Sequence, residues 1–265
     1  MPSARFVAGH PRQVRQGCVS LKSSPEEGGE QASQLLFGET FTVYDEADGW
    51  AWGQCGTDGY VGYVRAAALS PDIAPPSHHV AALRSFLYAE PALKRPPLDC
   101  LSLASSVAVA GGERNGYLPL ATGGWMFAGH LARLSVIEPD YVTTALRLLG
   151  APYLWGGRSS LGIDCSALVQ VALSAAGIAA PRDSDMQRNE VGVSLGPVPA
   201  DGLGVPFQRG DIVFFPGHVG IMLDHDRLVH ATAFVMAVTI EPLAAVIGRT
   251  DPTRGGGLLA VRRID

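Results

Sequence analysis

The sequence predicts an α+β protein, in which two small β-barrels precede a domain of helices packed on an antiparallel sheet. Two observations predict this layout. Before residue 135, short apolar alternations are separated by Asp-Gly, Asn-Gly and Gly-Gly steps, which supply the positive φ of tight hairpins. Beyond it, the spacing of apolar residues becomes helical and then returns to that of strands. We therefore expect three domains, at residues 1–72, 77–136 and 139–265.

Length and composition exclude several classes of protein. The chain has 265 residues, 47% hydrophobic and 17% charged, with a formal net charge of −5. This exceeds a typical domain of about 100 to 150 residues, so two or three folding units are expected. Lys and Arg are scattered along the chain, which argues against nucleic acid as a partner. The longest apolar stretches are shorter than the roughly 20 residues that span a bilayer, so no membrane segment is predicted.

The compartment and the state of the cysteines are predicted together. The N-terminus shows no apolar run of signal-peptide length, so we expect a cytoplasmic protein, with export by another route left open. The cysteines lie far apart without a CxxC pair, which favours reduced thiols over a zinc cage or a disulfide framework. One or two disulfides stay open as an alternative. The four cysteines are Cys18, Cys55, Cys100 and Cys165.

The first half of the chain contains an internal repeat at an offset of about 65 to 67 residues. The module resembles the bacterial SH3-type domain, in which a DGW-like step, a DGYVGY-like step and a terminal leucine recur. The alternative is two unrelated β-rich segments. Residues 70–76, rich in proline, are the predicted linker. The overlay sets Glu39–Val43, Asp48–Trp52, Asp58–Val64 and Leu69 against Ser106–Val109, Asn115–Leu118, Gly123–Phe127 and Leu134.

The second half begins with two helices. Apolar residues recur at helical spacing from Pro139 to Gly150, and glycine suits a left-handed C-terminal cap. Residues 166–176 are apolar almost all round, so this helix should be buried, and Gly177 should end it. The remaining apolar runs are typical of strands. We expect these strands at residues 211–215, 218–223, 228–232, 235–240 and 258–264.

Cys165 is the predicted nucleophile. It opens the buried helix, directly after Asp164. A thiol attacks as a thiolate, and the partial positive charge of a helix N-terminus favours the anion. The alternative for Cys165 is a small core residue, the usual place of a free cysteine; this alternative suits the other three cysteines well.

His218 is the predicted base, and His230 the residue that orients it. A Cys-His pair needs a third polar group to hold the imidazole. A two-residue loop at 225–226 would place the two histidines on opposite faces of the hairpin, so an odd loop or a bulge is required. Cys165, His218 and His230 could instead bind zinc, but they lie on three elements without a short-spaced pair. No metal or other cofactor is therefore predicted.

The block from residue 139 to about 264 resembles the NlpC-type family of bacterial cell-wall cysteine peptidases, which are papain-like. The resemblance implies Cys165 as nucleophile, His218 as general base and acid, His230 as orienting group, and Tyr153 on the oxyanion side with the amide of Cys165. Ala167 departs from the family, which usually has glycine there. The motifs that carry the resemblance are YLWGG, DCSALVQ, PRDSDMQ, GDIVFF, HVGIML and LVHA.

Family members with SH3-type modules cut wall peptides after D-Glu when the N-terminal L-Ala is free. Carried over by motif, the resemblance implies that Asp164 accepts the substrate ammonium and that Ser166 and Ser184 contact the substrate backbone or the D-Glu carboxylate. Tyr60 in the first barrel is the candidate for closing that pocket. The alternatives are helix N-capping for Asp164 and a solvated turn for residues 182–184.

The sequence therefore predicts a cysteine peptidase that hydrolyses the γ-D-glutamyl to diamino-acid bond of peptidoglycan fragments through a thioacyl intermediate. Two other functions stay open: a wall-binding protein without catalysis, and a papain-like amidase or acyltransferase. Cleavage of an L-Ala-γ-D-Glu-diamino-acid tripeptide, beside its N-acetylated form, separates them. The diamino acid preferred and the oligomeric state are not predicted.

Overall fold

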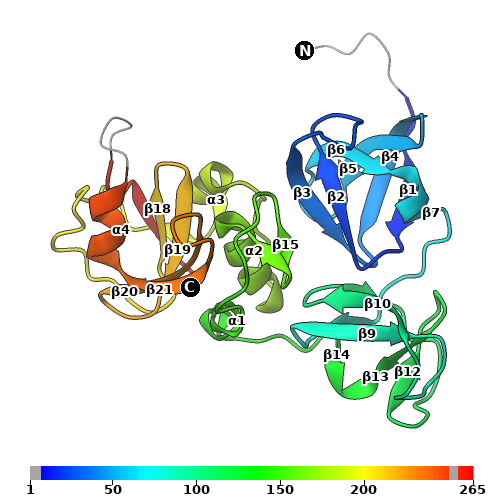
Figure 1. Ribbon diagram of the computed structural model, residues 1–265. Coiled ribbons are helices and arrows are strands. Elements are labelled where there is room, and N and C mark those ends of the chain that lie inside the picture. The colour runs from blue at the N-terminus through cyan, green and yellow to red at the C-terminus, as the bar shows by residue number, and fades with distance from the viewer. Residues whose placement is uncertain (1–6, 251–255, 265) are drawn as a thin grey trace. The chain divides into compact units, whose positions relative to one another are not determined.

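The structure is a computed structural model that describes residues 7–250 and 256–264. The chain divides into an N-terminal unit, Met1–Val136, and a C-terminal unit, Ile137–Asp265 (Figure 1). The parts of the predicted domains that fall on residues 1–6, 251–255 and 265 lie outside the described residues.

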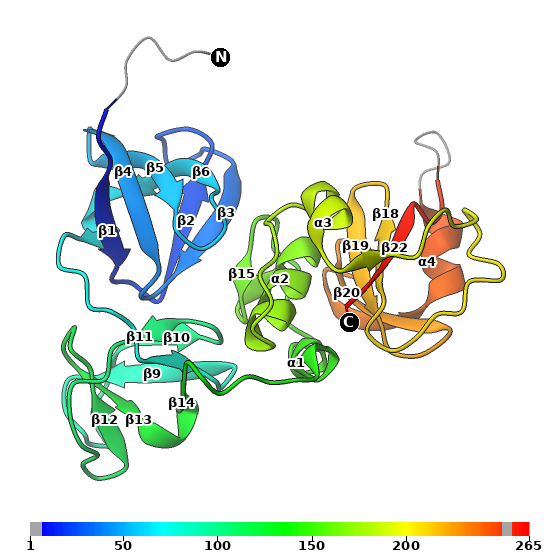
Figure 2. The same ribbon diagram turned by 180° about the vertical axis from the view of Figure 1, so that it is seen from behind.

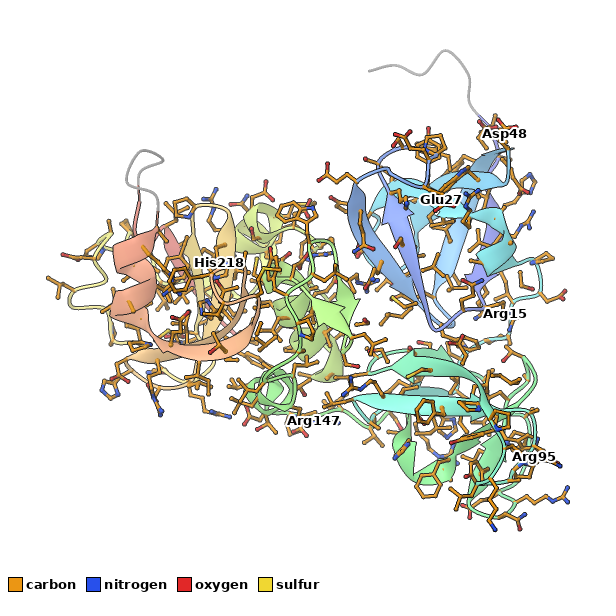
Figure 3. The ribbon with its side chains drawn as sticks, in the orientation of Figure 1. Arg15, Glu27, Asp48, Arg95, Arg147 and His218 are labelled. Carbon is orange, nitrogen blue, oxygen red and sulfur yellow. The ribbon has the colours of Figure 1, made fainter. Side chains whose placement is uncertain are left out.

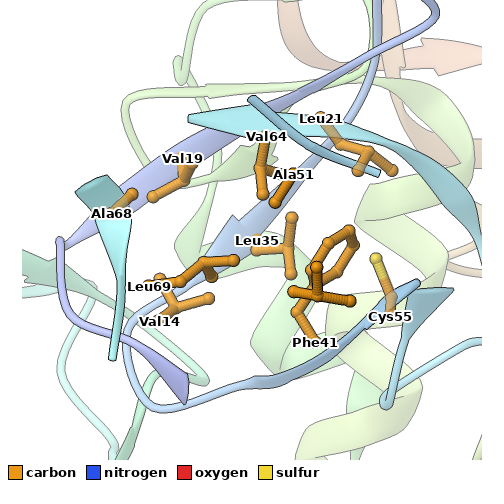
Figure 4. Close-up of a cluster of buried hydrophobic side chains, with 11 residues drawn as sticks. Val14, Val19, Leu21, Leu35, Phe41, Ala51, Cys55, Val64, Ala68 and Leu69 are labelled. Carbon is orange, nitrogen blue, oxygen red and sulfur yellow. The ribbon is translucent and has the colours of Figure 1, made fainter. Parts of the chain in front are cut away.

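The first β-module of the N-terminal unit is a seven-stranded antiparallel sheet with strand order β3-β2-β6-β5-β4-β1-β7. Leu21, Leu35 and Phe41 are fully buried in its core (Figure 4). Burial of apolar surface stabilises such a module by about 25 cal/mol per Å². Its elements are β1 (His10–Val14), β2 (Cys18–Lys22), β3 (Gln31–Leu36), β4 (Thr40–Ala47), β5 (Trp50–Cys55), β6 (Val61–Arg65), the 3-10 helix η1 (Ala66–Ala68) and β7 (Leu69–Ser70).

The predicted Asp-Gly and Asn-Gly turns are present. Asp48 and Gly49 have φ of 51° and 77° and join β4 to β5. Asn115 and Gly116, with φ of 51° and 82°, form the matching turn of the second module. A two-residue hairpin of this kind needs positive φ at both central positions, which these residues tolerate.

The second β-module has two small antiparallel sheets, β10-β9-β13-β12 and β11-β8-β14. Its core takes in Phe37 from the first module, beside Val80 and Leu101. Ser106 also donates its N–H to the carbonyl of Phe37 at 2.9 Å, so Phe37 connects the first module to the core of the second. That the second module is an SH3-type barrel stays a prediction. Its elements are β8 (His78–Val80), β9 (Arg84–Tyr88), β10 (Pro97–Ser102), β11 (Ser106–Val107), β12 (Tyr117–Pro119), β13 (Trp125–Phe127), η2 (Ala128–His130) and β14 (Leu131–Arg133).

The end of the repeat differs from the sequence overlay. η1 and η2 are capped by Leu69 and Leu131, whose backbone dihedrals are nearly the same. The overlay set Leu69 against Leu134, which lies three residues too far along the chain. Strand β13 has three residues where β6 has five, which accounts for two of these three positions.

The C-terminal unit is built on a six-stranded antiparallel sheet with strand order β17-β22-β18-β19-β20-β21. Helices α2 and α4 lie on opposite sides of this sheet (Figures 1 and 2), which confirms the predicted α+β layout. Leu243 and Val246 of α4 pack with Met222 and Leu228 of the sheet. The elements are α1 (Tyr141–Arg147), β15 (Arg158–Ser159), β16 (Gly162–Ile163), α2 (Cys165–Ala175), α3 (Ser184–Glu190), β17 (Val193–Ser194), β18 (Ile212–Phe215), β19 (His218–Met222), β20 (Arg227–Thr232), β21 (Ala237–Pro242), α4 (Leu243–Arg249) and β22 (Ala260–Arg263).

Helix α2 forms as predicted. The Asp164 side chain accepts the N–H of Ala167 and so caps the first turn. Every residue from 165 to 173 is buried, including Ala167 where the resembled family has glycine. Gly177 has φ of 77° just beyond the helix, a left-handed position that favours glycine.

Strand β21 is displaced from its prediction by two residues. The sequence predicts a strand over 235–240, whereas β21 runs Ala237–Pro242. Residues 233–236 form the turn instead, and Met236 has φ of 54°. These turn residues are mostly apolar and carry no Gly, Pro, Asn or Asp, so the turn has no local sequence signal.

The structure bears on two further expectations, which are that the cysteines are reduced and that no segment spans a membrane. All four cysteines lie in the described part of the chain, and each is a free thiol. The structure therefore agrees with reduced thiols and not with the alternative of one or two disulfides. Within the described residues, no helix has the length and apolar character needed to cross a bilayer.

Candidate active site

Cys165 is the first residue of α2, in the turn whose amides have no partner inside the helix. Its sulfur accepts hydrogen bonds from the amides of Ser166 and Val219. Val219 directly follows His218 at the start of β19, so the sulfur lies where that strand begins. Cys165 is 8% exposed. The structure thus brings the predicted nucleophile to the strand that carries the predicted base.

The charge state of this thiol differs from the expectation. Burial raises the pKa of Cys165 to about 12, and the neighbouring Asp164 carboxylate raises it as well. The two amides and the Arg182 guanidinium lower the pKa of the thiol, but by less. Desolvation therefore outweighs the partial charge of the helix N-terminus. The resting nucleophile is a neutral thiol, which must lose its proton as it attacks.

His218 and His230 are hydrogen-bonded, with 2.8 Å between Nε2 of the first and Nδ1 of the second (His218 is labelled in Figure 3). The register of the hairpin explains this contact. Met222 pairs with Leu228, and the loop Asp224–Asp226 has three residues. Because an odd loop keeps the two histidines on one face, the predicted need for such a loop is confirmed.

Both imidazoles are neutral in this environment. Burial is the largest of the effects that lower the pKa of His218 to about 3, and His230 and Arg249 contribute smaller ones. His230 is fully buried, and burial lowers its pKa against the opposing effect of Glu241. A neutral imidazole carries one N–H and one lone pair. His218 is therefore in the form that accepts a proton.

Glu241 stands behind His230 and was not singled out from the sequence. Its Oε2 lies 2.9 Å from Nε2 of His230. Glu241 pairs with Leu228 across the hairpin, two residues from His230, so the carboxylate and the imidazole are diagonal neighbours on one face. The displacement of β21 hid this residue, because Glu241 falls outside the strand predicted over 235–240.

Arg249, the last residue of α4, holds Glu241 in place. It donates from Nη1 to Oε1 of Glu241 at 2.8 Å and from Nη2 to Oε2. Its guanidinium also lies over the ring of Phe234, 4.3 Å from the centroid. Two hydrogen bonds from one guanidinium fix the orientation of the carboxylate as well as its charge.

The Asp164 carboxylate is occupied by the protein itself. Arg182 donates to its two oxygens at 3.0 and 2.5 Å. The amides of Gly156 and Ala167 donate to it at 3.0 and 2.8 Å. With these four bonds, the carboxylate has little acceptor capacity left for a substrate ammonium. The N-capping role of Asp164 is present, and its implied role toward the substrate ammonium stays a prediction.

Ser166 belongs to the same ion pair. Its hydroxyl donates to Asp164 at 3.2 Å and accepts from Arg182 at 2.9 Å. Arg182 is 2% exposed, so the residues 182–184 are not a wholly solvated turn. Ser166 thus holds the start of α2, and its implied contact with the substrate stays a prediction. The sequence pointed to this segment but missed Arg182 as the partner of Asp164.

Tyr153 lies near the nucleophile. Burial, with smaller effects of the nearby Cys165 and Asp164, raises the pKa of Tyr153 to about 12. The phenol therefore keeps its proton and is a hydrogen-bond donor. The N–H of Tyr153 donates to the carbonyl of Met236 at 2.9 Å, which fixes its backbone. A preorganised donor of this kind is what an oxyanion needs, and the oxyanion role of Tyr153 stays a prediction.

Helix α3 borders a cavity beside the base. Gln187 ties α3 to α2, donating to the carbonyl of Ser166 at 2.9 Å. The cavity measures about 270 Å³. Phe215 is one of the residues that line it, and its ring lies 5.9 Å from the ring of His218, centroid to centroid. The implied substrate contact of Ser184, which lines the cavity, stays a prediction. The full lining is Ser184, Asp185, Arg188, Phe214, Phe215, Gly217 and Leu259.

Tyr60 lies in the N-terminal unit, where its side chain packs against the core of the first β-module. Its N–H donates to Asp58 at 3.1 Å. The other candidate residues all belong to the C-terminal unit. That Tyr60 closes the substrate pocket therefore stays a prediction.

One group of side chains within the described residues brings three metal-ligand atoms together: Asp224, His225 and Asp226. They form the loop between β19 and β20. The Asp224 carboxylate already accepts the amides of Asp226 and Arg227 at 3.1 and 2.9 Å. These contacts are those of a side chain that stabilises its own turn.

Two family models match the chain. Residues 150–248 match the NlpC/P60 family, and residues 21–69 match the bacterial dipeptidyl-peptidase Sh3 domain. The chain therefore combines an SH3-type domain with an NlpC/P60 domain, as its sequence motifs predicted. The SH3 match lies within the first β-module and does not reach the second.

Two curated relatives align with different shares of the chain. The gamma-D-glutamyl-L-lysine dipeptidyl-peptidase of Bacillus subtilis (strain 168) is 27% identical over 261 residues, which cover 87% of this chain and 80% of that protein. Dipeptidyl-peptidase 6 of Lysinibacillus sphaericus is 35% identical over 116 residues, covering 44% and 40%. The match thus spans less than half of the Lysinibacillus protein.

Two solved structures share the fold. An NlpC/P60 family protein from Bacillus cereus ATCC 10987 superposes with a TM-score of 0.76 at 19% identity, covering 96% of this chain and 99% of that one. An NlpC/P60 endopeptidase from Photobacterium damselae subsp. piscicida gives 0.63 at 16% identity, covering 95% and 70%. At these identities the likeness concerns the fold.

Proposed function

We propose that this protein is a cysteine peptidase that hydrolyses the γ-D-glutamyl to diamino-acid bond of peptidoglycan-derived peptides with a free N-terminal L-Ala. The observation that carries the proposal is the placement of the Cys165 sulfur at the start of β19, where His218 is hydrogen-bonded to His230. The name of the Bacillus subtilis relative supports the choice of bond. Action on recycled fragments in the cytoplasm stays a prediction from the sequence.

The first half of the reaction forms a thioester. His218 takes the proton of the Cys165 thiol while the sulfur attacks the γ-carbonyl of D-Glu. The negative charge on the carbonyl oxygen is stabilised by the amide of Cys165 and the phenol of Tyr153. His218 then gives its proton to the departing amine of the diamino acid. The C–N bond breaks, and the acyl group stays on sulfur.

The second half of the reaction releases the acyl group. His218 removes a proton from a water molecule, which attacks the thioester carbonyl. The C–S bond breaks, and the proton returns to the sulfur. Cys165 is again a neutral thiol, the resting form that its environment favours. His230 keeps its hydrogen bond to His218 throughout and so holds the imidazole in one orientation.

The cavity beside His218 is proposed to take the diamino-acid residue. Its wall combines apolar side chains, such as Phe214 and Leu259, with the charges of Asp185 and Arg188. A diamino acid has matching parts: an aliphatic chain, an ammonium and a carboxylate. Opposite charges at a partly desolvated wall favour such a ligand.

The nucleophile is tested with the tripeptide L-Ala-γ-D-Glu-L-Lys. We expect Cys165→Ala to lower kcat by at least about 1000-fold, because the covalent route is removed. Cys100→Ala, a free cysteine in the N-terminal unit, is the matched control and should keep the activity of the parent. Retained cleavage by Cys165→Ala rejects the mechanism. Binding of the tripeptide without cleavage by the parent favours the wall-binding alternative.

The cavity is tested with a second tripeptide, in which L-norleucine replaces L-Lys. We expect the parent to prefer the lysine peptide, and Asp185→Asn to reduce this preference by roughly fivefold or more, because the side-chain ammonium loses its partner. Asp226→Asn, in the β19–β20 loop, is the control. An unchanged preference in Asp185→Asn places the diamino acid elsewhere.

A further inference from the structure

Three side chains form a line of hydrogen bonds that ends at Glu241. Nε2 of His218 is 2.8 Å from Nδ1 of His230, and Nε2 of His230 is 2.9 Å from Oε2 of Glu241. Both ring nitrogens of His230 are thus occupied. For His218, Nδ1 is the ring nitrogen outside this line. The direction in which these bonds donate decides whether that nitrogen can act as a base.

Glu241 is held as an ionised carboxylate. Arg249 binds both of its oxygens, and the hydrogen bond from Arg249 lowers the pKa of Glu241 more than any other contact. The guanidinium is itself kept in place over the ring of Phe234. An ionised carboxylate has no hydrogen to donate. The bond between Glu241 and His230 therefore has one direction, from imidazole to carboxylate.

We propose that Glu241, held by Arg249, is a positioning residue that sets the tautomer of both histidines. Since Glu241 accepts, His230 carries its hydrogen on Nε2 and has a lone pair on Nδ1. His218 must then donate from Nε2, which leaves the lone pair of His218 on Nδ1. That nitrogen is the base for the thiol of Cys165. The proposal goes beyond the proposed function, and it rests on that function for Cys165 as nucleophile.

The opposite set of tautomers is unproductive. It would place a lone pair of His230 against the carboxylate, and the hydrogen of His218 on Nδ1, where no proton could be accepted. A hydrogen bond to an ionised acceptor is about twice as strong as one between neutral groups. The Glu241 end of the line therefore determines the direction of the bond between the two imidazoles.

The test compares the parent with Glu241→Gln, whose amide can donate as well as accept. Nitrogen-15 NMR of labelled histidines at pH 7 reports the tautomers directly. We expect hydrogen on Nε2 of both rings in the parent and a mixture in the variant. The kcat for the L-Ala-γ-D-Glu-L-Lys tripeptide should fall about 10- to 100-fold, with KM within about twofold. Alkylation of Cys165 by iodoacetamide should slow in parallel, since it needs the same base.

Two variants separate positioning from a structural role. Glu241→Asp keeps the charge, so it should keep hydrogen on Nε2 of both rings and recover part of kcat. Glu113→Gln, exposed in the N-terminal unit, should change none of the three readouts. Hydrogen on Nδ1 of His218 in the parent overturns the proposal, and so do unchanged tautomers and alkylation in Glu241→Gln. If the parent does not cleave the tripeptide, the proposed function is wrong. The NMR and alkylation measurements would then still test whether Glu241 sets the tautomers of the two histidines.

Discussion

Two Arg–carboxylate pairs flank the candidate active site, one next to Cys165 and one next to the two histidines. Behind the thiol, Arg182 and Asp164 have side chains that are 2% and 10% exposed. Behind the imidazoles, Arg249 and Glu241 have side chains that are 25% and 17% exposed. A deeply buried charge that loses its partner destabilises the fold strongly, whereas a pair nearer the solvent loses less. The first pair should therefore act mainly on stability and the second mainly on catalysis.

The largest effect is expected when the deep pair is broken. Arg182→Met leaves the Asp164 carboxylate buried without its guanidinium, so the free energy of unfolding should fall by about 3 to 5 kcal/mol. Urea denaturation measures this change. Arg209→Met is the matched control, because its pair with Asp140 has both side chains more than 40% exposed; it should lower stability by less than about 1 kcal/mol. Equal losses in the two variants would show that depth does not distinguish the pairs.

Breaking the less buried pair, Arg249 and Glu241, should affect catalysis more than stability. Arg249→Met should lower kcat about tenfold, because Glu241 loses its orientation, while stability falls by only about 1 kcal/mol. In a double-mutant cycle with Glu241→Gln, the effects on kcat should be far from additive, since both changes disturb one line of hydrogen bonds. Additive losses in kcat would mean that the two residues act separately.

The pH dependence of stability should distinguish the two histidines from the thiol of Cys165. Unfolded histidine protonates near pH 6.5, whereas burial lowers the pKa of His218 to about 3 and lowers that of His230 as well. The unfolded chain thus binds more protons below pH 6.5, and stability should fall there by up to about 1.4 kcal/mol per pH unit for each ring. The pKa of the Cys165 thiol is raised in the folded protein. The stability that this shift contributes should therefore be lost in alkali, above the ordinary pKa of cysteine.

Urea midpoints measured at several pH values check both predictions. His218→Gln should weaken the loss of stability in acid, and Cys165→Ser should weaken the loss of stability in alkali. His10→Gln, at the start of β1, should change neither. If stability still falls as steeply with pH in His218→Gln and Cys165→Ser as in the parent, groups other than His218 and Cys165 cause the pH dependence.

Parts of this site were predictable from the sequence because their signals are local. Cys165 follows an N-capping Asp164 at the head of an apolar helix, and the hairpin turns carry Asp-Gly and Asn-Gly. The spacing of His218 and His230 called for an odd loop or a bulge, and the structure has the odd loop. Glu241 was not predictable, since the turn that sets its register is made mostly of apolar residues.

Other features depend on burial, which the sequence does not reveal. The helix N-terminus suggested a thiolate, but the depth of Cys165 raises the pKa of the thiol instead. The partner of Asp164 is Arg182, 18 positions along the chain. The sequence pattern offered no reason to join these two residues, so their ion pair was not predicted.

The loop Asp224–Asp226 constrains how the sequence of this protein can vary. Its side chains lie at the far end of the hairpin from His218, so exchanging residues there should be tolerated as long as the turn forms. Adding or removing one residue is different, because every side chain of one strand would then change face. Natural variants of this protein should therefore differ in which residues they have at positions 224–226, while the length of the loop stays the same.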